Sequence, residues 1–287
     1  MITKTEAVIL KSMNYRDSSK IVTFYTRRFG KIKCIAKGAR QAKNKFGAGL
    51  EPITGVMLVL YKKEQRDLQL VSQCDALKTY KNIHSELERM AVALSALELV
   101  NQLVHDEEEN EALYQLLVET LDEIDRAKKN MLNLFFAFEI RCAALFGFAP
   151  DLASCSVCGR GLDEIGADGS AVFQLARGSV VCAACAGTKG GRESIPLTPA
   201  RKTGDDASRR TAAEGSVRVS VGILKTLHKF LTGRLDSVSL IELTTAAGNE
   251  IDGTLRLYLR QHFEDLKPIK SLDMLKSYSV AMTEKHQ

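Results

Sequence analysis

The 287-residue sequence predicts an α+β multidomain protein, with a small N-terminal β-barrel, an α-helical bundle and a four-cysteine module inserted into that bundle. Three observations predict this order. Segments rich in β-branched and aromatic residues occupy the first 80 residues, segments with helical spacing follow, and two CxxC pairs interrupt the helical pattern. The expected parts are the barrel at 1–80, the helical domain at 81–150 and 192–287, and the cysteine module at 151–191.

The predicted barrel contains five short strands: EAVIL, KIVTFYT, KIKCIA, ITGVMLVLY and LQLVSQ. Polar or glycine-containing turns such as RRFGK and KKEQRD separate them. This part of the chain has no long helical segment that could cover an open sheet. Closing the sheet removes its unpaired edges, so we expect a barrel of the OB-fold type, which typically binds nucleic acid.

The helical domain begins where the apolar spacing changes after residue 80. SELERMAVALSALELVNQLVH and EALYQLLVETLDEIDRAKK are amphipathic, and Ser85 with Glu88 predicts a capping box at the first of them. MLNLFFAFEIRCAALFG is apolar nearly all round, which predicts a buried helix. We expect the DEEEN segment to be a solvated connection, residues 201–216 to form a flexible loop, and VGILKTLHKFL and IDGTLRLYLRQHFEDL to complete the bundle.

Charge is distributed unevenly along the chain. Residues 1–80 contain 16 Lys and Arg against 6 Asp and Glu, a net charge of +10, whereas residues 81–150 carry −7 and residues 151–287 carry +2. A concentration of positive charge in one domain indicates a polyanionic partner for that domain.

The cysteine module has the pattern C-x2-C-x23-C-x2-C, with Cys155, Cys158, Cys182 and Cys185 as candidate metal ligands. Two such turns present four thiolates in a tetrahedron, which predicts a structural Zn²⁺ site; an iron–sulfur centre and a site that has lost its metal are the alternatives. A closed four-thiolate site leaves no position for water or substrate, so we expect it to support the fold and not to catalyse a reaction. Isolated cysteines such as Cys142 are expected to be core residues.

A basic segment, KIKCIAKGARQAKNKFGAG, supplies the candidate nucleic-acid contacts. Its first strand alternates lysines with small or apolar residues, which makes one face cationic. Tyr15 and Phe29 lie among the cations, and a single strand of nucleic acid requires both charge and flat stacking surfaces. The alternative is that the lysines only solubilise an exposed strand. The candidate contacts are Arg16, Lys20, Arg27, Arg28, Lys31, Lys33, Lys37, Arg40, Lys43 and Lys45.

Enzymatic motifs are missing from the sequence. It contains neither the phosphate-binding pattern G-x-x-x-x-G-K-[ST] nor the zinc-protease pattern H-E-x-x-H, and its five histidines have no partner spacing. No run of eighteen apolar residues occurs, and the start lacks the plan of a signal peptide. We therefore expect a cytoplasmic protein that is not an enzyme.

The successive runs ILKSMNYRDSSKIVTFYTRRFGKIKCIAKGAR, GAGLEPIT and LRLYLRQHFEDLKPIKSLDML resemble the bacterial RecO recombination mediators, over nearly the whole chain. The resemblance implies a nucleoid-associated DNA repair protein that binds single- and double-stranded DNA and anneals complementary strands coated by single-strand DNA-binding protein. It also implies a RecR-type partner in recombinase loading, and a helical domain that docks the C-terminal tail of the single-strand binding protein. The family's basic surface corresponds to Lys31, Lys33, Lys37 and Arg40, with Arg16, Arg27 and Arg28 nearby.

Two other functions compete with this one. A zinc-stabilised transcriptional regulator would bind DNA through the CxxC module, but from Cys155 to Cys185 only Arg160 and Arg177 are basic, against three acidic residues. An RNA-binding OB protein stays open, because stacking and phosphate contacts accept both nucleic acids.

Overall fold

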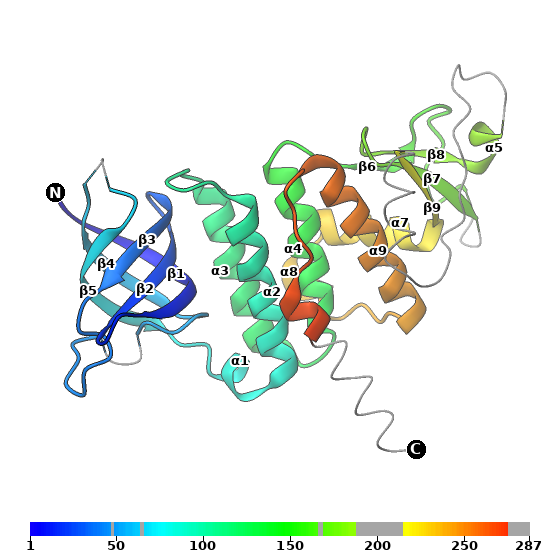
Figure 1. Ribbon diagram of the computed structural model, residues 1–287. Helices are drawn as coiled ribbons and strands as arrows, with labels where there is room; N and C mark the ends of the chain where they lie inside the picture. The colour runs from blue at the N-terminus through cyan, green and yellow to red at the C-terminus, as the bar shows by residue number, and fades with distance from the viewer. Residues whose placement is uncertain (47–48, 64–65, 166–168, 188–214, 275–287) are drawn as a thin grey trace. The chain divides into compact units, whose positions relative to one another are not determined.

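The structure is a computed structural model that describes residues 1–274 apart from 47–48, 64–65, 166–168 and 188–214. The chain forms two compact units. The first comprises Met1–Met131 and Lys267–Gln287, and the second comprises Leu132–Leu266. The barrel and the first three helices therefore belong to one unit (Figure 1).

The N-terminal strands close into the predicted barrel, in the order β1-β2-β3-β5-β4. Its neighbouring strands pair antiparallel except β3 and β5, which are parallel. Each predicted segment largely coincides with one strand, although ITGVMLVLY begins two residues before β4 and LQLVSQ begins one residue before β5, and β1 and β5 run well beyond the apolar segment. The strands are β1 (Ile2–Tyr15), β2 (Ser19–Thr26), β3 (Gly30–Ala36), β4 (Gly55–Tyr61) and β5 (Gln69–Lys78).

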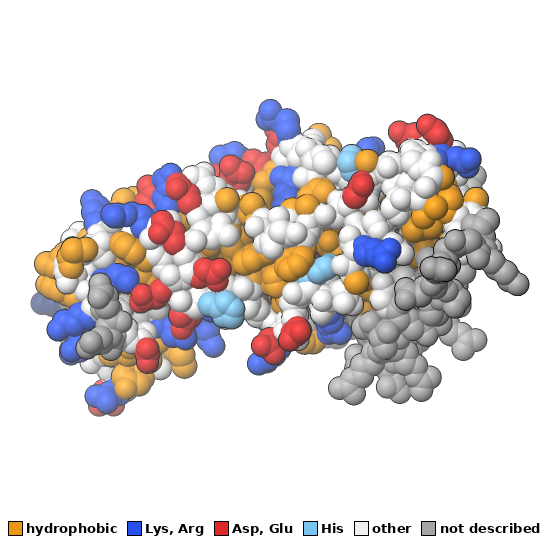
Figure 2. Space-filling view, turned by 90° about the horizontal axis from the view of Figure 1, so that it is seen from above, with side chains coloured by type: hydrophobic (Ala, Val, Ile, Leu, Met, Phe, Trp, Pro, Cys, Tyr) orange, Lys and Arg blue, Asp and Glu red, His pale blue; other side chains and the backbone are white. Residues whose placement is uncertain are grey.

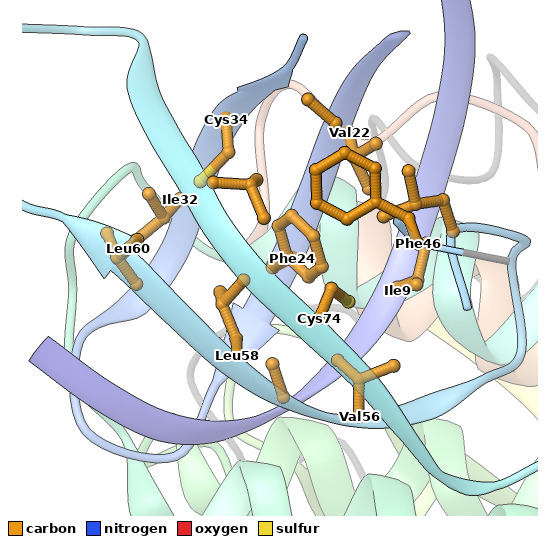
Figure 3. Packing of buried hydrophobic residues seen from close by; sticks show 14 of the residues in the cluster. Ile9, Val22, Phe24, Ile32, Cys34, Phe46, Val56, Leu58, Leu60 and Cys74 are labelled. Atoms are coloured by element: carbon orange, nitrogen blue, oxygen red, sulfur yellow. The ribbon is translucent and has the colours of Figure 1, made fainter. Parts of the chain in front are cut away.

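The interior of the barrel is apolar, because alternate side chains of each strand point inward. Phe24, Ile32 and Leu58 are among the buried side chains that meet there (Figure 3). Cys34 and Cys74 lie in the same core, where burial raises the pKa of the Cys34 thiol well above its usual value and that of Cys74 to about 12. Both thiols stay protonated and act as small core residues.

Helices α1 (Lys81–Ser85), α2 (Leu87–Leu103) and α3 (Glu111–Arg126) follow the barrel. The predicted capping box is wrong. The Ser85 hydroxyl donates to the Asn82 carbonyl and ends α1, and α2 begins after Glu86, whose carboxylate instead accepts from Arg89 Nε at 2.7 Å. Asn110 caps α3 by accepting a hydrogen bond from the Leu113 amide at 2.9 Å.

The second unit combines helices with a small sheet. Helix α4 (Met131–Leu145) is buried as predicted, with Phe135, Phe136 and Phe138 inaccessible to solvent. Among the described residues of this unit, the other helices are α5 (Ala183–Ala186), α7 (Val221–Thr232), α8 (Leu235–Val238) and α9 (Thr245–His262).

The sheet of the second unit has the order β6-β8-β7-β9, with β6 (Asp151–Cys155), β7 (Ser170–Gln174), β8 (Ser179–Cys182) and β9 (Ser216–Ser220). Strands β7 and β8 form the predicted hairpin. Strand β9 was not predicted: it pairs antiparallel with β7, and Ser216, expected at the end of a flexible loop, is its first residue. The rest of that expected loop, up to residue 214, lies outside the described residues.

Candidate nucleic-acid interface and metal centre

The strand directions divide the ten candidate cations between two ends of the barrel. Strand β2 runs toward the turn at residues 27–29, and β3 runs back from Gly30 toward the segment at 37–46. We call the first the hairpin end, with Arg27, Arg28, Lys31 and Lys33. We call the second the loop end, with Arg16, Lys20, Lys37, Arg40, Lys43 and Lys45.

Arginine 40 organises the loop end. Its amide donates to the Ser18 carbonyl at 2.9 Å, and its Nη1 donates to the Arg16 carbonyl at 3.0 Å, which fastens the segment at 37–46 to the β1–β2 turn. Lys45 Nζ donates to the Ser72 carbonyl at 2.6 Å. These contacts hold cations from distant parts of the sequence together at one end of the barrel.

The loop end retains most of its positive charge. Lys20 pairs with Glu51 at 2.6 Å, and it is the only one of the six loop-end cations with a carboxylate partner among the described residues. Lys37 and Lys43 are exposed to solvent, and the Arg16 guanidinium lies 5.2 Å from the centre of the half-buried Tyr15 ring. The loop end thus combines uncompensated cations with an aromatic ring.

The hairpin end is different, because an acidic segment at residues 106–111 lies against it. Lys33 Nζ is 2.7 Å from Asp106 Oδ2, and Arg27 is 2.7 Å from a Glu111 carboxylate oxygen. The Glu107 amide also donates to the Lys31 carbonyl at 2.8 Å. The DEEEN connection, expected to be only solvated, is therefore bound to the barrel. On the face shown in Figure 2, basic and acidic side chains accordingly lie close together over the barrel.

The side chain of Lys31 is mostly enclosed, with 11% of its surface exposed. Its ammonium donates to the carbonyls of Asn101 at 3.0 Å and Val104 at 2.6 Å, at the C-terminal end of α2. A cation here satisfies carbonyls that lack helical partners and interacts favourably with the helix dipole. Burial opposes ionisation of the neighbouring Asp106, but the hydrogen bond from Lys33 and the charges of both lysines hold the pKa of that carboxyl below its usual value.

Glycine 30 permits the close approach of the acidic segment, and sequence reasoning missed it. Its φ of +60° lies in the left-handed region, and a Cβ there would overlap the carbonyl group of Glu108. In the sequence, Gly30 is marked only by its position in a turn between two predicted strands. That position does not show that Glu108, far away in the sequence, packs against it.

The four cysteines of the second unit converge as predicted. Their sulfur atoms all lie within 4.8 Å of one another, and Cys158 Sγ is 3.8 Å from Cys182 Sγ. Tetrahedral Zn–S bonds of about 2.3 Å place sulfurs about 3.8 Å apart, so the cluster fits a four-thiolate metal centre.

The backbone around Cys155 favours its thiolate, whereas hydrogen bonds with the neighbouring cysteines raise the pKa of Cys185 to about 12. Burial alone would raise the pKa of Cys155, but amide donors of Cys158, Cys182 and Val157 lower it to about 6. The Cys182 amide, for example, lies 3.3 Å from Cys155 Sγ. A deprotonated sulfur is the form that binds metal.

Two family models match this chain: "Recombination protein O N terminal" over residues 1–80 and "Recombination protein O C terminal" over residues 84–201. The chain belongs to the recombination protein O family. The DNA repair protein RecO of Chloroherpeton thalassium is 30% identical over 275 residues, 96% of this chain and 98% of the relative. That of Symbiobacterium thermophilum is 29% identical over 273 residues, 95% of this chain and 97% of the relative.

Family membership confirms the resemblance seen in the sequence. The N-terminal RecO match ends at residue 80, just after the last barrel strand, and the C-terminal match includes all four cysteines.

Outside these two sites, the His262 ring stacks on Phe148, with ring centroids 4.4 Å apart. Its Nε2 lies 3.0 Å from the Leu175 carbonyl oxygen, so both contacts indicate a packing role for this histidine. No helix in the described ranges combines the length and apolar character that a membrane span requires.

Proposed function

We propose that this RecO-family protein is a non-enzymatic mediator of DNA repair and homologous recombination that contacts DNA through the loop end of its barrel. Family membership and the relatives named DNA repair protein RecO support the general role. The observation that carries the location is the set of loop-end cations, five of which have no carboxylate partner in the described part of the chain. Such cations neutralise phosphates and release their counterions.

The mechanism follows from charge and stacking. Arg16, Lys37 and Lys43 contact the phosphates of single- or double-stranded DNA, and Tyr15 offers a face on which a base can stack. Two strands screened by bound protein repel each other less while their bases stay free to pair, which promotes annealing. The hairpin-end candidates Arg27, Arg28, Lys31 and Lys33 lie at the other end of the barrel, and three of them are held by intramolecular contacts.

The helical domain and the cysteine module have supporting roles in this proposal. The family resemblance supports docking of a RecR-type partner and of the C-terminal tail of single-strand DNA-binding protein, which brings the protein to coated DNA for recombinase loading. Structural Zn²⁺ at Cys155, Cys158, Cys182 and Cys185 holds the ends of β6 and β8 together. We place this activity in the cytoplasm, on nucleoid DNA.

The test is annealing of complementary strands coated with single-strand binding protein, together with direct binding to single-stranded DNA. Charge reversal of Lys37 and Lys43 (K37E/K43E) should abolish both. The matched control K81E/K128E makes the same charge change at exposed lysines outside the barrel and should keep both activities. Equal loss in the two variants, or none in the first, would refute the assigned surface.

Two further results would decide between the competing functions. Loss of DNA binding in a folded Cys158→Ser variant would favour a regulator that binds DNA through the cysteine module. A large preference for RNA over single-stranded DNA of equal length would favour the RNA-binding function.

A further inference from the structure

The acidic segment and the hairpin end form a set of ion pairs between residues far apart in the sequence. Besides the Lys33–Asp106 and Arg27–Glu111 pairs, Lys62 Nζ lies 2.9 Å from Glu107 Oε2. Asp106 Oδ1 also lies 3.5 Å from Lys31 Nζ, so the segment places three carboxylates against four barrel cations, as a polyanionic ligand would.

We propose that the acidic segment acts as an internal competitor for nucleic acid, so that it determines which end of the barrel a DNA strand can use. This inference rests on the proposed function, since it concerns the path of DNA over the same barrel. In the folded protein the hairpin end is occupied by the chain's own carboxylates, and DNA is confined to the loop end.

The exposure of these groups makes the competition electrostatic. The side chains of Asp106 and Glu111 are 48% and 55% exposed, and those of Lys33 and Arg27 are 48% and 39% exposed. These cations therefore face solvent and a phosphate could reach them. A DNA phosphate that replaced a carboxylate at one of these cations would leave the carboxylate unpaired. The carboxylate would then lie beside the negatively charged DNA backbone, and the two like charges would repel each other.

Lys31 differs from the other hairpin-end cations. Besides its 3.5 Å pair with Asp106, its ammonium donates to two carbonyls at the end of α2 and its side chain is mostly enclosed, so removing that carboxylate does not release it. Arg28 has no carboxylate partner among the described residues and lies 5.3 Å from the centre of the Phe29 ring. The cations that the acidic segment withholds are therefore Lys33 and Arg27, with Lys62 beside them. Arg27 also lies 3.5 Å from Glu6 of β1, a longer contact than its 2.7 Å pair with Glu111.

The test measures how the affinity of the full-length protein for a single-stranded oligothymidylate depends on salt. Removing two carboxylates in D106N/E111Q should steepen the slope of log affinity against log salt by about 1.4, because each added single-strand phosphate contact contributes about 0.7. The control E109Q/E119Q removes the same charge at exposed residues for which the structure gives no barrel contact, and its slope should equal that of the wild type.

A second pair of variants keeps the test valid if the acidic substitutions disturb folding. Adding R27M/K33M to D106N/E111Q should return the slope to the wild-type value, whereas R27M/K33M alone should leave the slope unchanged. Thermal unfolding of each variant verifies the fold. Equal slopes for D106N/E111Q and E109Q/E119Q would overturn the inference while leaving the proposed function intact; absence of DNA binding by the wild type would remove the proposed function itself.

Discussion

Replacing Gly30 by alanine tests the contact on which the hairpin end depends. The backbone of Gly30 has a φ of +60°, and the carbonyl group of Glu108 occupies the space that a Cβ would require. That neighbour is backbone and cannot rotate away as a side chain can. Alanine therefore forces either β3 or the acidic segment to move.

The magnitude follows from the contacts that are lost. A left-handed φ at alanine costs about 1–2 kcal/mol. Displacing the acidic segment breaks the Glu107–Lys31 backbone hydrogen bond of 2.8 Å, worth about 1 kcal/mol. It also breaks the half-exposed Lys33–Asp106 pair, which contributes no more than about 1 kcal/mol. We expect Gly30→Ala to lower the free energy of unfolding by about 2–4 kcal/mol.

Gly38→Ala is the matched control, at a glycine just beyond the other end of β3. Its φ of +73° imposes similar strain, but a Cβ there would lie 3.2 Å from Gln41 Oε1, the movable end of a side chain. Urea unfolding followed by circular dichroism should show that Gly38→Ala lowers the free energy of unfolding by about 1–2 kcal/mol. Gly30→Ala should lower it by at least about 1 kcal/mol more. Equal losses in the two variants would show that the close approach of Gly30 to Glu108 does not contribute to the free energy of unfolding.

Three further predictions follow from the same contacts. Lys31→Met should destabilise the protein by about 2–3 kcal/mol in urea unfolding because two helix-end carbonyls lose a charged donor, whereas Lys37→Met should change stability by no more than about 0.5 kcal/mol. A metal chelator should lower the thermal unfolding temperature of the wild type but not of Cys158→Ser, and a chelator-insensitive wild type would contradict a structural metal. The pKa of Asp106 is lower in the folded protein than in the unfolded chain. The ionised Asp106 carboxylate therefore contributes fully to the free energy of unfolding above the pKa of the unfolded state, and this contribution is lost as the pH falls through the pKa of the folded state. The stability difference between wild type and Asp106→Asn should therefore stay constant above about pH 5 and shrink below about pH 4; a difference that grows on acidification would refute the pairing.

Local sequence patterns predicted the elements whose signals are local. Alternation in KIKCIA predicted a strand with one cationic face, and Ile32 and Cys34 on its other face lie in the core. The two CxxC turns predicted the converging sulfurs. The prediction failed where a distant contact or a competing partner decides the structure. Ser85 bonds to α1 instead of capping α2, and β9 is five residues long and completes its sheet only by pairing with β7.

The sequence could not predict which cations have a carboxylate partner, for the same reason. Lys33 and Lys37 look alike in the sequence, both lying in one basic segment. In the structure both are exposed, but Lys33 reaches Asp106, 73 residues away, whereas Lys37 has no carboxylate partner among the described residues. No local pattern distinguishes them, since the difference arises from the return of the chain after α2.

The charge asymmetry along the chain has to be reinterpreted in this light. The surplus of +10 in residues 1–80 and the −7 in residues 81–150 are not independent surfaces, because the acidic segment is bound to the barrel. Asp106, Glu107 and Glu111 neutralise part of the surplus at the hairpin end, so among the described residues the uncompensated cations gather at the loop end, where we propose that DNA binds. Net charge predicts a polyanionic partner for this domain, and the ion pairs show which of its cations already have a carboxylate partner. The same barrel with a neutral α2–α3 connection would present cations at both ends, and a strand could then follow its whole length.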